Sequence, residues 1–508
     1  MTIHPFAKHI VIIGAGQLGV TFCLFLDRWL QAQLAGYPIR VTLIDEATEP
    51  LAGATRGSWI DHATGLEYFK RGEIKTAHAC IEGSIVKHLL LPDGIHDLPV
   101  PIRNRFFVSA ESNRTGTVVF DDFYFQAQRG AAYYRSIYDR TVAVYPDAAQ
   151  KLTDPARFVT FLPRDEFKGV NGDTVSAGVR SAGGSSNVPM EVALKRSALR
   201  HAQRKELVRL LTGTTVKTIK ETTNGVVITV KKENGETERL EAEYVFATAA
   251  HGISKVAALA HGRDLPGAYH LNFMLHAQLP PTADQVLIDH LSSVNFVLQG
   301  QHGGMYACIV PPTERHAGVA ALFAPGYGGS YIDDYATKTD PLPLIEWDQL
   351  ILSSAFPALR AKAESVMTRI LRLNPFLKDY LHAATPVSDR VVVGSVYNPH
   401  GDVRSVRRMT PPRKLLPNQR ILGMTSPKWT TVELSALTLL QYVLCKLLPN
   451  LKLPSVPNGF GPYNIDVASV VAELRISNVQ FARDVAENYL DALGLPRRIL
   501  PASHSSYA

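Results

Sequence analysis

The sequence predicts an α/β fold in which a parallel-sheet domain is interrupted by a second domain built on a mixed β-sheet. Three observations predict it. A β-branched strand, a glycine-rich turn and an apolar helix follow one another over residues 9–34. A strand that ends in small residues, 243–250, follows much later in the chain. A glycine-bearing strand and an apolar helix, over 420–448, then close the same sheet.

Length and composition favour a multidomain enzyme-sized protein. The chain has 508 residues, of which 46% are hydrophobic and 19% charged, as is typical of a soluble protein with two or three domains. The net charge of +7 favours an anionic substrate, an anionic cofactor or a membrane surface as partner. Nucleic-acid binding is not expected, because the sequence has no dense Lys/Arg block, zinc-finger spacing or RNA-binding signature.

The four cysteines, Cys23, Cys80, Cys308 and Cys445, are scattered without paired spacing. This pattern argues against a disulfide framework and against a metal site, and it favours a reducing compartment. No uninterrupted apolar run reaches the roughly 18 residues that a membrane span requires. We therefore expect a cytoplasmic protein with no metal, with association at a membrane surface as the alternative.

The turn Gly14-x-Gly16-x-x-Gly19 lies between the first strand and the first helix, which is the context that a dinucleotide-binding turn requires. Gly14 permits the tight turn, Gly16 lets the backbone approach a pyrophosphate, and Gly19 lets helix and strand pack closely. The helix begins at Gln17 and Leu18. Its N-terminal end offers backbone amides and a positive partial charge to phosphates. This region is predicted to be a Rossmann-like βαβ unit.

Asp45 ends the second strand and is predicted to accept hydrogen bonds from ribose hydroxyls. An acid at this place disfavours a 2′-phosphate, so NADP is not the expected ligand. FAD is preferred over NAD because the returning and closing strands lie so far along the chain, and because no second G-x-G-x-x-G unit is present. Asp45 lies 26 positions after Gly19, more than the usual ~20, which predicts an extended helix or an enlarged turn.

The remaining elements are predicted from periodicity and turn residues. They are helices over 73–90, 192–211 and 465–493, strands at 215–219, 225–231, 271–279 and 295–298, a hairpin turn at Asn234-Gly235, and part of a second sheet over 105–165.

Four stretches carry a resemblance to a known family: 10–19, 41–68, 244–252 and 421–440. Together they resemble the D-amino-acid-oxidase/glycerol-3-phosphate-dehydrogenase superfamily of FAD oxidoreductases, and within it the malate:quinone oxidoreductase branch. That branch also has a long first helix, a Trp followed by a Thr-Gly pair, and a Gly…Ser-Pro turn. The matching residues are Trp59, Thr64, Gly65, Gly423, Ser426 and Pro427. The branch's His after Thr-Gly is Leu66 here.

The resemblance implies a glutathione-reductase-type FAD-binding domain interrupted by a mixed-sheet substrate domain. The implied boundaries are 1–100, 166–262 and 386–450 for FAD binding, 101–165 and 263–385 for substrate binding, and 451–508 for a helical extension. The implied cofactor-binding residues are Gly14, Gly16, Gln17, Leu18, Gly19, Asp45, Glu46, Arg56, Ser58, Trp59, Val216, Ala249, Gly423, Lys428, Trp429 and Thr430.

Three residues are candidates for catalysis. His62 is a candidate base or substrate ligand, with a hydrogen-bonded structural histidine as the alternative. Lys428, in the turn before the closing helix, faces either the flavin or solvent. Arg407, between Arg404 and Arg408, is a candidate to bind a carboxylate bidentately, with a solvated basic loop as the alternative.

Other residues have weaker claims to the site. His251 follows the returning strand, and the candidate pocket residues on the substrate-domain sheet are His270, His276, His302 and Tyr306. Thr430 and Glu433 form a predicted capping box at the start of the closing helix. The apolar stretch 436–448 is predicted to pack in the core, with membrane docking as the alternative.

The predicted activity is hydride transfer from a small carboxylate-bearing hydroxy or amino compound to FAD. Oxygen and quinone are both open as electron acceptors, and a quinone contact at a membrane surface follows from the resemblance. One alternative is a flavin monooxygenase or tailoring oxidase with a larger substrate. Another is a flavin-binding subunit without catalysis, which the replacement at Leu66 permits.

Overall fold

The structure is a computed structural model of the chain. It describes residues 8–33, 39–52, 60–62, 65–71, 74–90, 103–166, 175–182, 185–204, 208–262, 268–278, 293–299, 303–310, 320–325, 386–398, 413–414, 420–426 and 429–447. The expected helices around 465–493 lie outside these residues.

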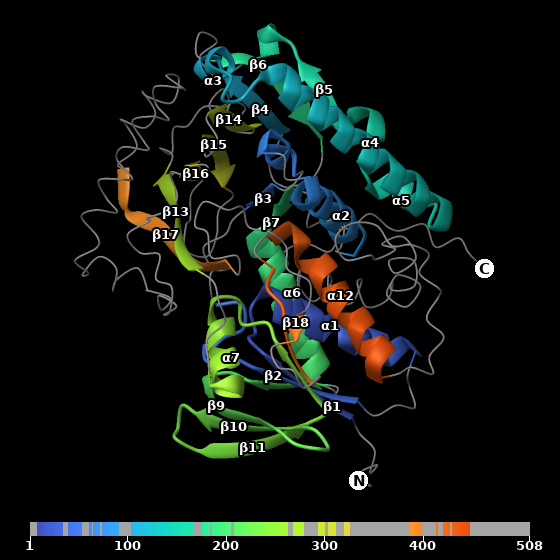
Figure 1. The fold of residues 1–508 in the computed structure, drawn as a ribbon, viewed down its shortest axis with the longest axis vertical. Helices are drawn as coiled ribbons and strands as arrows, with labels where there is room; N and C mark the ends of the chain where they lie inside the picture. Colours follow the sequence, from blue (N-terminus) through green and yellow to red (C-terminus); the bar gives the residue numbers. More distant parts are fainter. Residues whose placement is uncertain are drawn as a thin grey trace, which may run out of the picture.

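The first domain is built on a six-stranded sheet with the order β18-β19-β12-β1-β2-β8 (Figure 1). Its strands are β1 (Lys8–Ile13), β2 (Ile39–Ile44), β8 (Val208–Leu211), β12 (Tyr244–Ala247), β18 (Arg413–Lys414) and β19 (Ile421–Gly423). All neighbours are parallel except β18, which runs antiparallel to β19. The returning and closing strands predicted from the sequence therefore join the first strand in one sheet.

Both faces of this sheet are buried, which is why its strands read as continuous apolar runs. Ile10 and Ile12 face a core that includes side chains of α1 (Gln17–Gln33), α2 (Ile74–Leu90), α6 (Val188–Arg204) and α12 (Val432–Leu447). Val11 and Ile13 face α7 (Ile253–His261) and a three-stranded antiparallel sheet. That sheet consists of β9 (Thr214–Glu221), β10 (Val226–Lys232) and β11 (Thr237–Ala242), which lie together at the bottom of Figure 1. The predicted Asn234-Gly235 turn joins β10 to β11, with Gly235 at φ +88°.

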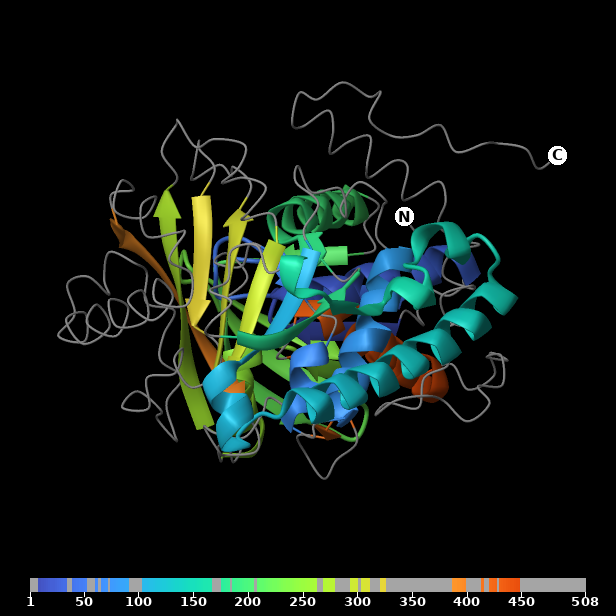
Figure 2. The ribbon, with the colours of Figure 1, turned by 90° about the horizontal axis from the view of Figure 1, so that it is seen from above.

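The second domain contains an eight-stranded mixed sheet with the order β17-β13-β16-β15-β14-β4-β6-β5. Its strands are β4 (Arg103–Ser109), β5 (Val159–Leu162), β6 (Val175–Ser181), β13 (Ala268–Gln278), β14 (Ser293–Gln299), β15 (Gly303–Val310), β16 (Ala320–Pro325) and β17 (Pro386–Asn398). Figure 2 shows these strands side by side, with the long cyan helix α4 (Phe120–Val144) in front. Two further elements of this part of the chain are α3 (Ala110–Thr115) and α5 (Ala148–Lys151).

The prediction of sheet over all of 105–165 was wrong for its middle part, where α3, α4 and α5 lie between β4 and β5. The buried residues of α4 recur every three or four positions, which is the period of a helix and not of a strand. They are Phe120, Phe123, Ala127, Gly130, Tyr134, Ile137 and Thr141. The buried residues of this segment therefore form one helix face.

The predicted helix 192–211 also differs at its ends. The helix α6 begins earlier and ends at Arg204, and 208–211 forms the edge strand β8 instead. The pairing of Val208 with Val41 explains the difference, because a parallel partner distant in sequence decides the conformation of a short apolar run. The other predicted helices and strands within the described residues are present.

Two strands belong to a different sheet from the one that the predicted domain boundaries imply. β6 and β17 both hydrogen-bond within the eight-stranded sheet, although 166–262 and 386–450 were expected in the FAD-binding part. A short antiparallel pair links the two parts of the chain near the start of α6: β3 (Ile60–His62) pairs with β7 (Ser185–Asn187). Among the described residues, no helix has the length and apolar content to cross a membrane.

Candidate cofactor site

The three glycines of the turn after β1 have three different environments. Gly14 adopts φ +105°, and a Cβ atom there would lie 2.5 Å from the Cα of Ala249. A Cβ atom at Gly19 would lie 1.9 Å from the carbonyl oxygen of Gly14 and 2.6 Å from Oγ1 of Thr248. Gly14 therefore permits the turn and Gly19 the close packing of helix on strand, as the sequence predicted.

Gly16 is the half-buried member of the motif, whereas Gly14 and Gly19 are buried. A Cβ atom there would meet no heavy atom of the described residues within 4 Å. The backbone at Gly16 thus borders open space immediately before the first residue of α1, where free backbone amides and the helix dipole favour an anion. The turn fits the pyrophosphate of a dinucleotide, because the groups that would contact it are backbone amides and no side chain of the motif blocks the approach.

Asp45 lies at the carboxyl end of β2 and is bonded to this turn. Its Oδ2 accepts a hydrogen bond from the amide of Ala15 at 2.5 Å, and its Oδ1 accepts one from the amide of Ala47 at 2.8 Å. Burial raises the pKa of the Asp45 carboxyl, and the two backbone amides oppose that rise. The Asp45 carbonyl also accepts from the amide of Thr214, which brings the start of β9 to the same place.

The carboxyl end of β12 forms the other wall of the turn. The hydroxyl of Thr248 lies within hydrogen-bond distance of the carbonyl oxygens of Ile13 and Gly14, at 3.2 and 3.0 Å. Ala250 follows with φ +45°, a strained conformation for a residue with a side chain. Leu51 has φ +62° and donates its amide to the carbonyl of Ala15. Leu51 and Ala250, the two described non-glycine residues with positive φ, therefore both lie beside the glycine turn.

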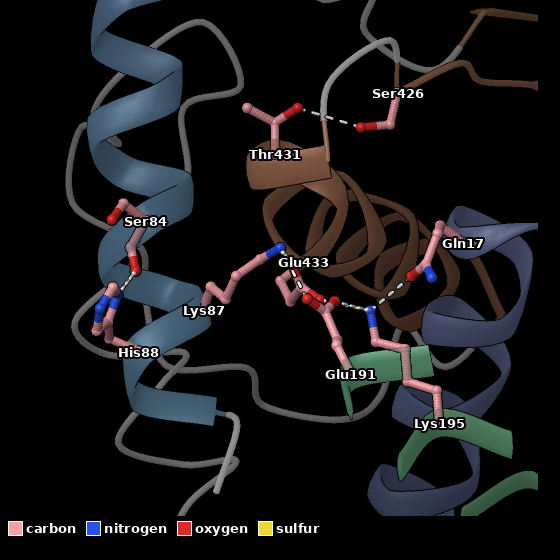
Figure 3. A network of polar contacts seen from close by, with 9 residues as sticks. All are labelled: Gln17, Ser84, Lys87, His88, Glu191, Lys195, Ser426, Thr431 and Glu433. Atoms are coloured by element: carbon pink, nitrogen blue, oxygen red, sulfur yellow. Dashed lines mark hydrogen bonds and ion pairs between the residues drawn. The ribbon is translucent and has the colours of Figure 1, made fainter. Parts of the chain in front are cut away.

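Behind the turn, four charged side chains form a closed ring that we call the charge cluster: Lys87, Glu191, Lys195 and Glu433 (Figure 3). Each is no more than 4% exposed. The Lys195 ammonium lies 2.6 Å from Glu191 and 2.7 Å from Glu433, and the Lys87 ammonium lies 3.2 Å from Glu191 and 3.6 Å from Glu433. The charges alternate around the ring, so that each carboxylate lies between two ammonium groups.

The charge cluster is joined to the glycine turn by Gln17. Lys195 donates to Oε1 of Gln17 at 2.9 Å, and Gln17 directly follows Gly16 in the sequence. The ring also joins four helices, because its members come from α2, α6 and α12, and Gln17 opens α1. Burial raises the pKa of Glu433, and Lys195 and Lys87 oppose that rise.

The predicted capping box is corrected by this arrangement. Glu433 directs its carboxylate to Lys195 and Lys87 instead of to the backbone amide expected of a capping glutamate. A short 3-10 turn, Trp429–Thr431, precedes α12, and the hydroxyls of Thr431 and Ser426 lie 3.1 Å apart across it. The turn packs closely on α2, because a Cβ atom at Gly83 would lie 2.4 Å from the carbonyl oxygen of Thr430.

The structure thus brings several of the predicted cofactor residues together: Gly14, Gly16, Gln17, Leu18, Gly19, Asp45 and Ala249. Glu46 is exposed and pairs with Lys255 at 3.3 Å, and Val216 is buried in the core beneath β1. Gly423 ends β19 opposite Ala247 of β12, next to the same edge of the sheet. Thr430 is buried in the turn before α12.

Other predicted residues lie where less can be said. The predicted residues that lie outside the described residues are Arg56, Ser58, Trp59, Thr64, His302, Arg404, Arg407, Arg408, Pro427 and Lys428. The backbone alone is described for His62 in β3, Trp429 before α12, His251 after β12, His270 and His276 in β13, and Tyr306 in β15. Leu66 is buried in the core.

Sequence reasoning missed Lys87, Glu191 and Lys195. Glu191 and Lys195 are four residues apart on α6, a spacing that more often indicates an exposed helix pair. No local signal marks these side chains as buried, because the partners of Lys87 and Lys195 include residues of other helices.

The sequence matches no protein-family model and no curated protein. The structure matches L-α-glycerophosphate oxidase from Mycoplasma pneumoniae with FAD bound, with a TM-score of 0.53 and 16% identity, over 85% of this chain and 93% of that chain. Glycine oxidase from Geobacillus kaustophilus matches with a TM-score of 0.54 and 15% identity, over 87% and 95% of the two chains. L-proline dehydrogenase from P. horikoshii matches with a TM-score of 0.52 and 13% identity, over 89% and 96%.

By their names, these matched proteins are two oxidases, one of them with FAD bound, and a dehydrogenase. The chain shares the fold of these oxidases and this dehydrogenase, which agrees with the fold that the sequence resemblance implied. The finer likeness to malate:quinone oxidoreductases stays a prediction.

Proposed function

We propose that this chain is an FAD-dependent oxidoreductase that accepts a hydride from a small carboxylate-bearing hydroxy or amino compound. The observation that carries the proposal is the open backbone at Gly16, which directly precedes α1 and follows Ala15, whose amide donates a hydrogen bond to Asp45. The fold shared with a glycerophosphate oxidase that has FAD bound supports the choice of cofactor.

The chain's residues would hold FAD in a definite way. The turn from Gly14 to Gly19 and the first amides of α1 would bind the pyrophosphate, and Asp45 would accept hydrogen bonds from the ribose. The turn before α12 would lie towards the flavin, where a helix N-terminus stabilises negative charge. When bound, the flavin supplies the hydride acceptor, and the protein binds and orients the substrate and excludes water.

An anionic substrate is supported by two arginines on the substrate-domain sheet. Arg105 of β4 and Arg180 of β6 are directly opposite in the strand register. Phe106 contacts Phe123 of α4, so strand alternation puts Arg105 and Arg180 on the sheet face away from α4. A guanidinium group binds a carboxylate or phosphate bidentately, so two of them at opposite positions can bind one anion. We propose that they bind the carboxylate or phosphate of the substrate.

The end of the sheet at which these arginines lie supports the same assignment. Arg180 is close to the end of β6, from which the chain continues into β7 and then into α6 of the first domain. β7 pairs with β3, where His62 lies opposite Ser185. The candidate base and the candidate anion ligands therefore lie towards the junction of the two sheets. Arg407 is the other candidate for the carboxylate.

The first test is the visible spectrum of the purified protein, followed by acid release of the chromophore. A flavin spectrum and released FAD are expected, and a colourless protein that takes up no FAD would contradict the proposal. Anaerobic bleaching with hydroxy acids, amino acids and glycerol phosphates then identifies the substrate class. Bleaching by NADPH would favour a monooxygenase, and full occupancy without bleaching by any substrate would favour a non-catalytic flavin protein.

Three further measurements test the substrate ligand, the electron acceptor and the membrane contact. Arg105→Met is expected to raise the KM for an anionic substrate at least about tenfold, because a charged hydrogen bond is lost, and to leave FAD content unchanged. An unchanged KM would place the anion elsewhere, as at Arg407. Reoxidation of the bleached protein by air, or only by a soluble quinone, identifies the electron acceptor. Flotation with vesicles tests the alternative that the protein associates with a membrane surface.

A further inference from the structure

The charge cluster lies where the first turns of three helices meet. Gln17 is the first residue of α1, Glu433 the second residue of α12, and Glu191 the fourth residue of α6. A helix N-terminus carries a positive partial charge, so this meeting point attracts anions. In Figure 3 the side chains of Lys195, Glu191 and Glu433 converge between these helices, and Lys87 reaches them from α2.

The two carboxylates have an electrostatic cost for any phosphate bound at the glycine turn. Glu191 and Glu433 are buried, so water screens their charges weakly and their repulsion reaches neighbouring anions. The same carboxylates would cancel the attraction that the helix N-termini provide. A bound pyrophosphate next to Gly16 therefore requires that these charges be neutralised.

Lys87 and Lys195 provide that neutralisation. Each ammonium group contacts both carboxylates, and the ring of two lysines and two glutamates has no net charge. Lys195 also bonds Gln17, which fixes the first side chain of α1. A buried ion pair usually contributes little net stability against an apolar replacement, so stability alone does not explain four buried charges at this point.

We propose that Lys87 and Lys195 are positioning residues for the dinucleotide: they neutralise Glu191 and Glu433 and keep the N-terminal turns of α1 and α12 attractive to the cofactor's anionic groups. This inference rests on the proposed function, since it concerns how FAD is held. It assigns a role to side chains that do not touch FAD and act through charge balance and through Gln17.

The test compares single and charge-balanced variants of the apoprotein. Lys195→Met leaves excess negative charge, and FAD affinity is expected to fall at least about tenfold, because a buried carboxylate loses its partner. Glu191→Gln leaves excess positive charge, and FAD affinity is expected to stay equal or to increase. The double variant Lys195→Met/Glu191→Gln restores the balance and is expected to recover most of the affinity. Lys220→Met, at an exposed position of β9, controls for the loss of one lysine.

FAD dissociation constants are measured by quenching of flavin fluorescence, and the thermal midpoint of each apoprotein is measured separately. A purely structural cluster would make affinity follow the thermal midpoint in every variant, so that Glu191→Gln weakens binding as much as Lys195→Met; that result would overturn the inference. If Lys195→Met does not fold, Glu191→Gln and Glu433→Gln still test the inference. Loss of FAD affinity in either folded variant would contradict it. An unmodified chain that binds no FAD refutes the proposed function itself, and this inference falls with it.

Discussion

The carboxylate of Asp45 and the backbone amide of Ala15 are joined by a hydrogen bond of 2.5 Å, which ties the end of β2 to the glycine turn after β1. A second bond, to the amide of Ala47, fixes the same carboxylate from the other side. Asp45 thus shapes the turn as well as being the proposed ribose ligand. A carboxylate has about four acceptor sites, so two backbone bonds leave capacity for ribose hydroxyls.

Replacing Asp45 with Ala is expected to lower the free energy of unfolding of the apoprotein by about 1–3 kcal/mol, because two amides lose a charged acceptor. Glu46→Ala is the matched control. Glu46 is exposed and pairs only with Lys255 among the described residues, and such a pair contributes about 0–1 kcal/mol. Urea unfolding of both variants without FAD makes the comparison. Equal effects of the two substitutions would show that Asp45 does not hold the turn.

Within the glycine motif, Gly19 is expected to matter for folding and Gly16 for FAD binding. Gly19→Ala is expected to destabilise the apoprotein by several kcal/mol, on the order of the cost of overpacking, because the new Cβ meets a backbone oxygen at 1.9 Å. Gly16→Ala and Gly16→Val are expected to fold and to lose FAD, because their side chains would occupy the place of the pyrophosphate. Thermal unfolding and FAD content of each purified variant test this. Retained flavin in Gly16→Val would move the site elsewhere.

The nucleotide-binding part of the fold was predictable because its signals are local. The run from Ile10 to Gly19 encodes a buried strand, a positive φ at Gly14 and two close approaches in ten residues. Asp45 was placed correctly at the end of β2 for the same reason. Its bond to Ala15 was not predicted, because a sequence does not show which groups a carboxylate contacts before a ligand binds.

The charge cluster was not predictable, because its members come from distant segments and meet only through packing. Lys87 and Glu191 are far apart in the chain. The spacing of Glu433 from Thr430 matches a capping box, so the sequence predicted a backbone partner for Glu433 and not Lys87. The same limit explains β6 and β17: nothing local in either strand says which sheet it joins. The arginine pair likewise depends on a strand register that only the pairing of β4 with β6 reveals.

Two phenylalanines of α4 test whether this segment is a helix, as in the structure, and not a strand, as the sequence predicted. Phe123 is 1% exposed and packs near Phe106, whereas Phe125 is 61% exposed. Phe123→Ala is expected to cost about 3–5 kcal/mol of unfolding free energy, and Phe125→Ala less than about 0.5 kcal/mol. Urea unfolding measures both. In a strand, positions 123 and 125 would share a face, so similar costs for the two variants would contradict the helix.

The contact between α2 and α4 predicts a pH dependence of stability. Glu82 of α2 accepts a hydrogen bond from the hydroxyl of Tyr133 of α4, and His78 stacks on the Tyr133 ring with centroids 3.6 Å apart. Burial raises the pKa of Glu82 to about 7, with the Tyr133 hydrogen bond and the charge of Arg140 opposing the rise. Burial also lowers the pKa of His78, so this histidine is neutral near pH 7.

The sign of the effect follows from proton binding. Between the ordinary Glu pKa of 4.5 and about 7, the folded protein keeps the Glu82 proton and the unfolded chain releases it. Stability contributed by this group is therefore fully present below about pH 4.5 and decreases as the pH rises towards 7. Glu82→Gln removes the titration, so the variant should gain stability relative to the unmodified protein as the pH rises from 5 to 8. Asp139→Asn, at an exposed position of α4, is the control. Urea unfolding across this range measures the difference, and parallel pH profiles for Glu82→Gln and the unmodified protein would show that Glu82 is ionised in the folded state throughout.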